Sequence, residues 1–232
     1  MIYHRLRRPM SETFHVGALL TIVGGFFDAY TYIARGGVFA NAQTGNIVLL
    51  GISLAEGDLL KALSYFIPIT AFVLGIFTAE FLHGTNKKLP IYWRQLIIVL
   101  EIITVIVVAL LPTSTERMYS FNMLANIMIS YVCSLQVQTF RKIHGITCAT
   151  TMCTGNLRSG TDHLMRYQKS RNKQDLMDGI KYHALNLFFI AGAVLSMFLT
   201  KCFDSFSVLF CLLPLTIVFF LMFIKTPGNK KT

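Results

Sequence analysis

Residues 38–55 read VFANAQTGNIVLLGISLA, and residues 146–163 read ITCATTMCTGNLRSGTDH. Both stretches contain the triplet Thr-Gly-Asn, first as Thr44-Gly45-Asn46 and again as Thr154-Gly155-Asn156. The first stretch is moderately apolar, whereas the second is too polar to face lipid. Each follows a long apolar run by about ten residues, and these runs decide the fold class.

The apolar runs predict an all-α integral membrane protein. The hydrocarbon core of a bilayer is about 30 Å thick, so a helix that crosses it needs roughly 20 mostly apolar residues. Of the 232 residues, 54% are hydrophobic and only 14% are charged. We expect six transmembrane helices, at residues 14–33, 62–82, 95–111, 118–140, 184–200 and 206–224.

The net charge of +10 does not indicate a nucleic-acid-binding protein. The cations lie in short loops between apolar runs, where the insertion bias of membrane proteins places them. The longest polar stretch, residues 166–181, is too short for a soluble domain. We expect membrane lipid as a partner and no nucleic acid, and this basic stretch could hold anionic head groups.

The distribution of Lys and Arg bears on whether the two Thr-Gly-Asn stretches cross the bilayer. If both dip in and return, sixteen of the 21 cations lie in the cytoplasm, four lie outside, and Arg158 lies in the second stretch. If both cross, the split becomes thirteen against seven. The positive-inside rule favours the first arrangement. We therefore predict two re-entrant half-helix segments and both termini in the cytoplasm.

The sequence also suggests an internal duplication. The triplets are 110 residues apart, and Phe72, Gly75 and Phe81 recur at an offset of 117 as Phe189, Gly192 and Phe198. Each half holds three spans, an odd number, so two inverted repeats are predicted, which is a recurrent transporter design. The predicted divisions are a basic N-terminus (1–13), a first repeat (14–111), a second repeat (112–224) and a basic tail (225–232).

Each re-entrant segment is predicted to contain a short helix that begins at mid-membrane. Thr and Asn suit helix N-cap positions and Gly permits a tight turn, so the first helix should cover residues 47–54. The free N–H groups and positive dipole end at such a start attract anions or polar solutes. Inversion would bring the second start, near Asn156, up to meet the first. Alternatively, the triplets only cap two buried helices.

Asp28 is the strongest single candidate for a functional residue. It lies inside the first span, where a charge costs about 2.5–3.5 kcal/mol on insertion scales, so it should face the bundle. It could line a polar pore or couple transport to a proton or cation. Alternatively, it makes a structural hydrogen bond or pairs with Arg35. Gln136 and Gln138 occupy the matching place in the second half.

Four further polar residues lie at membrane depth. Arg158 could be a counter-ion to Asp28 or an anion ligand, or it could reach cytoplasmic water. Glu101 is a second intramembrane acid, well inside the third span. Asn122 and Asn126 lie one helical turn apart, and such residues more often hold helices together than bind solute.

A stripe of small residues, Gly17, Thr21 and Gly25, runs along the first span. Such stripes permit close helix contact, either within one chain or between two chains of a homodimer. The five cysteines are scattered without a CxxC pair, so no zinc site or disulfide framework is indicated. P-loop, GxSxG, HExxH and GxGxxG motifs are absent. We expect no metal, no cofactor and no enzyme activity, with an intramembrane enzyme as a third alternative.

Several of these residues carry a resemblance to a known family. They are Gly24-Gly25-Phe26-Phe27-Asp28-Ala29, Gly36-Gly37-Val38-Phe39, Gln43-Thr44-Gly45-Asn46, Leu49-Leu50-Gly51, Leu135-Gln136 and Thr154-Gly155. Nearly the whole chain resembles the YoaK family, bacterial membrane proteins built on a domain of unknown function. The resemblance implies a multi-span fold in the bacterial inner membrane and no established substrate.

Two functions are expected from these observations. The leading one is a transporter or channel for a small polar or anionic solute, with a path lined by Asp28, both Thr-Gly-Asn triplets and Gln136. The rival is a membrane scaffold or assembly protein. It would act through the small-residue stripe and the basic stretch 166–181.

Overall fold

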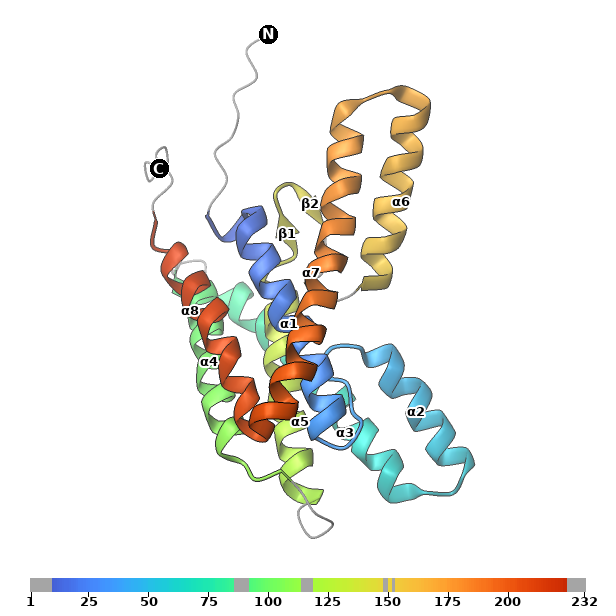
Figure 1. Cartoon of the computed structure of the whole chain (residues 1–232), viewed down its shortest axis with the longest axis vertical. Coiled ribbons are helices and arrows are strands. Elements are labelled where there is room, and N and C mark those ends of the chain that lie inside the picture. Colours follow the sequence, from blue (N-terminus) through green and yellow to red (C-terminus); the bar gives the residue numbers. More distant parts are fainter. Residues whose placement is uncertain (1–9, 86–91, 114–118, 148–149, 152, 225–232) are drawn as a thin grey trace.

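The computed structural model describes residues 10–85, 92–113, 119–147, 150–151 and 153–224 (Figure 1). The α-helices are Phe14–Ala34 (α1), Gln43–Ala55 (α2), Leu59–Thr85 (α3), Tyr92–Leu110 (α4), Tyr119–Thr139 (α5), Cys153–Ser170 (α6), Lys173–Phe203 (α7) and Leu212–Leu221 (α8). Two 3-10 helices cover Met10–Glu12 (η1) and Asp204–Cys211 (η3). A small antiparallel hairpin joins Lys142–Ile143 (β1) to Ile146–Thr147 (β2).

The length and apolar composition of its helices identify the chain as an all-α membrane protein. Five helical stretches are long and apolar enough to cross a bilayer, and the last of them, Lys173–Leu221, includes α7, η3 and α8. Figure 1 shows the chain reversing between α7 and α8, where Asp204 has a φ of 48°. The predicted fifth and sixth spans therefore lie in one continuous stretch, and the total of six stays a prediction.

Helix α1 occupies the centre of the bundle. Its side chains Leu20, Phe27 and Tyr30 are completely buried. They join residues of α4, α5, η3 and α8 in the main hydrophobic cluster. Lipid tails are as apolar as these side chains, so close packing rather than water exclusion holds such helices together. Asp28, on the same helix, is thereby brought into the interior.

Glycines permit the closest helix crossings. A Cβ atom at Gly25 of α1 would collide with the carbonyl group of Phe189 in α7, and one at Gly192 of α7 would collide with that of Ile22. Gly75 of α3 packs equally tightly against α5. The predicted small-residue stripe is therefore used, at Gly25, for a contact within one chain.

Helices α2 and α6 both begin beside the bundle and run in opposite directions (Figure 1). Helix α2 pairs with α3, and α6 pairs with α7. Helix α2 begins at Gln43, four residues before the predicted start, because the chain turns earlier, at Ala42. Helix α6 continues to Ser170, beyond the predicted end of its segment at residue 163.

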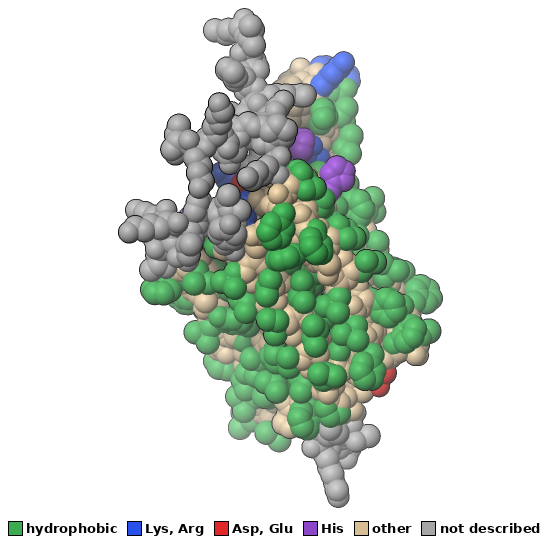
Figure 2. Space-filling view, turned by 90° about the vertical axis from the view of Figure 1, so that its left-hand side faces the viewer, with side chains coloured by type: hydrophobic (Ala, Val, Ile, Leu, Met, Phe, Trp, Pro, Cys, Tyr) green, Lys and Arg blue, Asp and Glu red, His purple; other side chains and the backbone are tan. Residues whose placement is uncertain are grey.

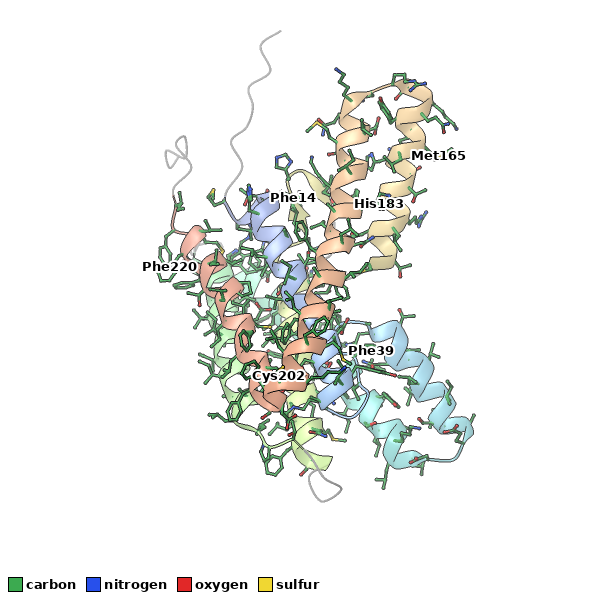
Figure 3. All side chains as sticks on the ribbon, in the orientation of Figure 1. Phe14, Phe39, Met165, His183, Cys202 and Phe220 are labelled. Atoms are coloured by element: carbon green, nitrogen blue, oxygen red, sulfur yellow. The ribbon has the colours of Figure 1, made fainter. Side chains whose placement is uncertain are left out.

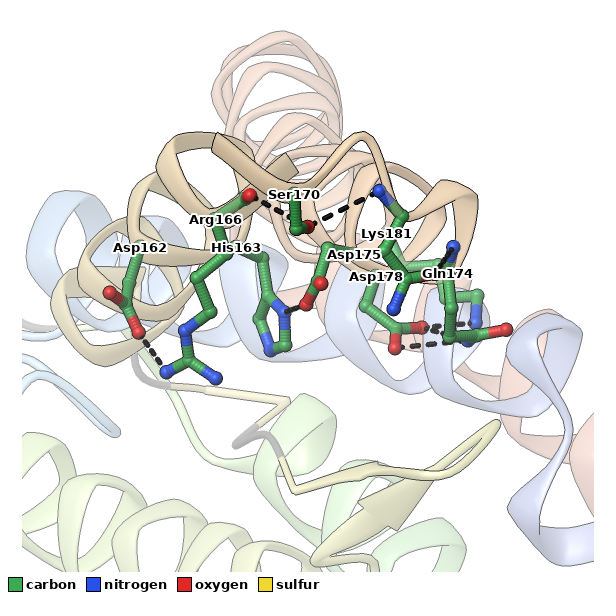
Figure 4. Close-up of polar contacts among 9 residues, drawn as sticks. Asp162, His163, Arg166, Ser170, Gln174, Asp175, Asp178 and Lys181 are labelled. Atoms are coloured by element: carbon green, nitrogen blue, oxygen red, sulfur yellow. Dashed lines mark hydrogen bonds and ion pairs between the residues drawn. The ribbon is translucent and has the colours of Figure 1, made fainter. Parts of the chain in front are cut away.

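The α6–α7 hairpin is held together by polar contacts (Figure 4). His163 Nδ1 lies 2.9 Å from Asp175 Oδ1, across the two helices. Asn172 Oδ1 accepts a hydrogen bond from Gln174 N at 3.0 Å and so caps the start of α7. Such contacts explain why this polar stretch is helical although it is unsuited to lipid. The basic stretch 166–181 forms the tip of this hairpin.

The exterior of the bundle is apolar. In Figure 2, hydrophobic side chains cover the body, and Lys and Arg side chains gather at the upper tip. Large exposed apolar residues include Phe66, Leu74, Phe77 and Phe81 on α3 and Leu187, Ile190 and Phe198 on α7. A soluble monomer rarely exposes apolar patches of this extent. Lipid is the solvent that suits this surface.

Candidate functional site

Asp28 anchors the loop that precedes α2. The residue is 5% exposed, and its carboxylate accepts hydrogen bonds from the backbone N–H groups of Asn41 at 2.6 Å and Ala42 at 3.3 Å. Ala42 is the N-cap residue of α2, so the carboxylate lies at the positive end of the helix dipole. The amides just ahead of α2 are therefore occupied by the chain itself, and anion binding at the first turn of this helix stays a prediction.

Asn46 closes the same loop from the other side. Its Oδ1 accepts a hydrogen bond from Phe39 N at 2.9 Å, and its Nδ2 donates to Phe39 O at 2.7 Å and to Gln43 Oε1 at 2.9 Å. The Phe39 ring, which lies between α1 and α2 in Figure 3, packs against Gly45. Asn46 is thus a positioning residue for the loop, whereas Thr44, in the same turn, is exposed.

The loop that precedes α6 meets α1 at Gly24, one turn from Asp28. Gln136, which is 1% exposed, donates from Nε2 to Thr150 Oγ1 at 2.9 Å. Gly24 in turn packs against the backbone of Thr150. From the first loop, Asn41 donates from Nδ2 to the carbonyl oxygen of Gly24 at 3.1 Å. The two loops therefore converge on the same turn of α1.

Two buried oxygen atoms at this junction have no hydrogen-bond partner among the described residues. They are Asn41 Oδ1 on the first loop and Thr151 Oγ1 on the second. Each residue lies three positions before its Thr-Gly-Asn triplet, so the two occupy equivalent places. Buried polar atoms in proteins are nearly always paired, with protein, water or ligand. This pair was missed from the sequence, although the equal spacing from the triplets could have revealed it.

The start of α6 also lies near Asp28. Burial, and then the negative charge of Asp28, raise the pKa of the Cys153 thiol to about 11. Cys153 is the first residue of α6. One carboxylate therefore lies within electrostatic reach of both short helices.

The two Thr-Gly-Asn triplets occupy equivalent positions in their helices. Thr, Gly and Asn are the second, third and fourth residues, counted from Gln43 in α2 and from Cys153 in α6. Thr is exposed in both helices, and Asn is buried in both, at 0% for Asn46 and 4% for Asn156. The triplet forms the first turn rather than the cap, so the predicted N-cap role of Thr is wrong for α2.

Two arginines near the predicted site differ in their surroundings. Arg158 is exposed on α6, and the ion pairs among the described residues do not include it. No described contact therefore supports its role as a counter-ion to Asp28. Arg35 is completely buried, and its hydrogen bonds go to groups other than Asp28.

Arg35 ties the end of α1 to the end of α4. Its guanidinium donates to Tyr30 Oη at 2.7 Å and to the carbonyl oxygens of Val108, Leu111 and Pro112 at 2.9, 3.0 and 2.9 Å. The last carbonyls of a helix have no partner within the helix, and a cation there complements the dipole. The sequence does not reveal this role of Arg35, because the carbonyl partners are backbone atoms 73 to 77 residues away.

The comparisons with known proteins agree with this architecture. A family model described as "Protein of unknown function (DUF1275)" matches residues 16–222. The "UPF0700 transmembrane protein YoaK" of Bacillus subtilis (strain 168) is 24% identical over 221 residues, which cover 92% of this chain and 95% of that protein. No solved structure matches the chain. The resemblance to YoaK is confirmed, and the chain belongs to the DUF1275 family of proteins of unknown function.

Proposed function

We propose that this protein is a transporter or channel that moves a small polar solute across the bacterial plasma membrane. The path would pass the junction of the two loops, beside Asp28 and Gln136 and the first turns of α2 and α6. The observation that carries the proposal is a pair of buried oxygens, Asn41 Oδ1 and Thr151 Oγ1, that have no hydrogen-bond partner in the described part of the chain. Irregular backbone at membrane depth is tolerated where it lines a cavity or is buried in protein.

The pattern of helix packing supports inverted repeats. Helix α1 packs on α7 as α5 packs on α3, and α2 pairs with α3 as α6 pairs with α7. If α1 is exchanged with α5, α2 with α6 and α3 with α7, the α1–α7 pair becomes the α5–α3 pair. The same exchange turns the α2–α3 pair into the α6–α7 pair. Gly75 and Gly192, which the duplication aligns, both lie at close crossings. Inverted repeats with short helices at their interface are typical of transporters.

The placement of the chain ends supports six spans. In Figure 1 the start of α1 and the end of α8 lie at the same end of the bundle, as an even number of crossings requires. The charge distribution would put this end in the cytoplasm. In this arrangement α2 would enter from the outer face and the α6–α7 hairpin would project into the cytoplasm.

The groups at the junction favour a neutral or cationic solute. An anion would have to approach the Asp28 carboxylate, whereas a hydrogen-bond donor would find Asn41 Oδ1 and Thr151 Oγ1. The Thr150 hydroxyl and the Gln136 amide are the other nearby polar groups. The proposed solute therefore differs from the sequence expectation, which included anions.

Flux into liposomes tests this proposal. Wild-type protein, Asp28→Asn and the exposed-loop control Glu56→Gln would be reconstituted, and uptake of labelled polyols, amines and anions measured. We expect uptake of a polyol or an amine above protein-free liposomes, kept in Glu56→Gln and lowered at least tenfold in Asp28→Asn. Background flux of every solute through wild-type protein, or selective uptake of anions alone, would overturn the proposal.

A scaffold function is the second candidate, and the α6–α7 hairpin is the feature that favours it. Its tip carries the exposed cations Lys169, Arg171 and Lys173. The other surface that this function would need, at Gly25, is covered by α7 of the same chain. Co-purification of one stoichiometric partner, lost when Lys169 and Lys173 are both changed to Glu, would support the scaffold. Unchanged co-purification of that partner would exclude the hairpin as its interface.

A further inference from the structure

Glu101 is a buried acid that does not line the proposed solute path. It lies in the middle of α4, and its side chain is 0% exposed. Neither Oε1 nor Oε2 has a hydrogen-bond partner within the described ranges. An intramembrane carboxyl group with no partner marks a functional site more often than a structural one.

The groups that face α4 from its neighbours supply no positive charge to Glu101. The buried thiols of Cys133 in α5 and Cys211 in η3 both lie within its electrostatic reach. Helix α8 has no ionisable side chain. Helix α1, which shares a hydrophobic cluster with α4, contributes Asp28 and Tyr30. The remaining ionisable residues on the described parts of α3, α5 and η3 that pack near α4 are Glu80, His83, Tyr131 and Asp204. The nearby arginines are committed elsewhere, Arg35 to the end of α4 and Arg94 to Glu12.

These surroundings limit what Glu101 can bind. An ionised carboxylate buried without a counter-charge is very unfavourable, so the group neutralises instead. A metal ion would need several donors, and the described residues hold no group of three His, Cys, Asp or Glu side chains that could bind one. A proton requires only one carboxylate oxygen. The ligand that suits this site is therefore a proton.

A polar face of α5 provides a route toward the loop junction. Asn126, Ser130, Cys133 and Gln136 are spaced three or four residues apart, which places them along one side of the helix, and each is at most 2% exposed. Asn126 Oδ1 and Ser130 Oγ have no hydrogen-bond partner among the described residues. Gln136 lies at the junction itself, through its bond to Thr150. Glu101 and the junction thus face the same buried polar stripe.

We infer that Glu101 is a proton-binding site, neutral in this conformation, and that it takes up and releases one proton when the conformation changes. For its use in transport, this inference rests on the proposed function. A proton-binding site at Glu101 would make the proton the coupling ion. A carboxyl group that is neutral when buried can release its proton only in a conformation that exposes it to water.

Infrared spectroscopy of the protein in liposomes tests the site without knowledge of the solute. At neutral pH we expect a carbonyl band of a protonated carboxylic acid that shifts slowly when H2O is exchanged for D2O. The band should persist in Asp28→Asn, which removes the other buried acid among the described residues, and in the exposed control Glu56→Gln. It should disappear in the double variant Asp28→Asn, Glu101→Gln, because Gln keeps the shape of the neutral acid and should fold. Absence of the band from wild-type protein, or its undiminished persistence in the double variant, would overturn the inference.

A flux experiment separates this inference from the proposed function. If wild-type protein moves a solute, an imposed pH gradient should change the accumulated amount severalfold, and Glu101→Gln should abolish that dependence while downhill exchange continues. Solute flux that is indifferent to pH in both proteins would refute proton coupling and leave transport intact. Failure of all flux, with the infrared band assigned to Glu101, would refute transport and leave the proton site intact.

Discussion

Helices α2 and α6 start from the same triplet but differ along the rest of their length. Helix α2 exposes apolar residues such as Ile47, Val48 and Ile52 and lies beside the bundle. Helix α6 carries charged residues such as Asp162 and Arg166 and projects from it. In both helices the triplet occupies the second to fourth positions, whereas composition decides whether the rest of the helix suits lipid or water.

The two loops are also anchored by different chemistry. A charged acceptor, Asp28, takes two backbone N–H groups in the first loop. In the second loop a neutral amide, Gln136, donates to the Thr150 hydroxyl. Charge-assisted hydrogen bonds are about twice as strong as neutral ones, so the two anchors should not contribute equally to stability.

The largest effect is expected at the crossing of α1 with α7. Gly25→Leu would force a side chain into the backbone of Phe189, which should destabilise the fold by about 3 kcal/mol or more, at the upper end of overpacking effects. We expect little monodisperse protein in gel filtration after extraction into detergent. Gly51→Leu is the matched control on α2, because a Cβ there meets no atom within 4 Å. Equal yields of the two variants would contradict the assigned crossing.

The second prediction compares the loop anchors directly. Asp28→Ala leaves the buried N–H groups of Asn41 and Ala42 without an acceptor, which should cost about 3 kcal/mol. Gln136→Ala removes one neutral hydrogen bond and should cost about 1 kcal/mol. Thermal unfolding of the purified variants in one detergent gives both values. If Gln136→Ala were the more destabilising, the ranking of the two anchors would be wrong.

A smaller effect concerns the electrostatic influence of Asp28 on Cys153, which lies in the second half of the chain. The thiolate is the reactive form of cysteine, and with a pKa of about 11 Cys153 should react slowly with N-ethylmaleimide at pH 8 and faster as the pH rises. Asp28→Asn removes a negative charge that raises this pKa, so it should speed the reaction at pH 8 by about twofold to tenfold. Mass spectrometry would follow the rate in a Cys148→Ser, Cys202→Ser background. An unchanged rate would place α6 beyond the influence of Asp28.

The smallest effects are expected in the α6–α7 hairpin. Loss of the N-cap of α7 in Asn172→Ala should cost about 1 kcal/mol. Asp162→Asn breaks an exposed ion pair with Arg166 and should cost less than about 0.5 kcal/mol. Hydrogen exchange should show faster opening of residues 160–180 in Asn172→Ala, with the bundle unchanged. Global unfolding at a lower temperature in Asp162→Asn would show that the hairpin is part of the core.

The sequence predicts the membrane class and most helix positions because both depend on local apolar length. Helix α1, predicted at residues 14–33, covers Phe14–Ala34. Helix α5, predicted at residues 118–140, covers Tyr119–Thr139. Errors are larger where polar residues continue a helix. Helix α7 starts at Lys173, eleven residues before the apolar run, because the paired α6 and the Asn172 cap stabilise its polar half.

The site was predicted in part, for a related reason. Asp28 and Gln136 stand out because each is a polar residue in an apolar run, which is visible locally. Their partners are loop groups, and these depend on how the halves fold together. Arg35 shows the limit most clearly, since a fully buried arginine bonded to distant backbone carbonyls looks, in sequence, like a loop cation.

The close crossing at Gly25 and Gly192 has a mechanical consequence. At both positions one backbone lies directly on the carbonyl group of the other helix, with no side chain between them. Two helices in such contact can tilt about the contact point, but they cannot slide past each other without losing the contact. Helices α1 and α7 belong to different halves of the chain, so this contact would be the pivot if one half rocked against the other.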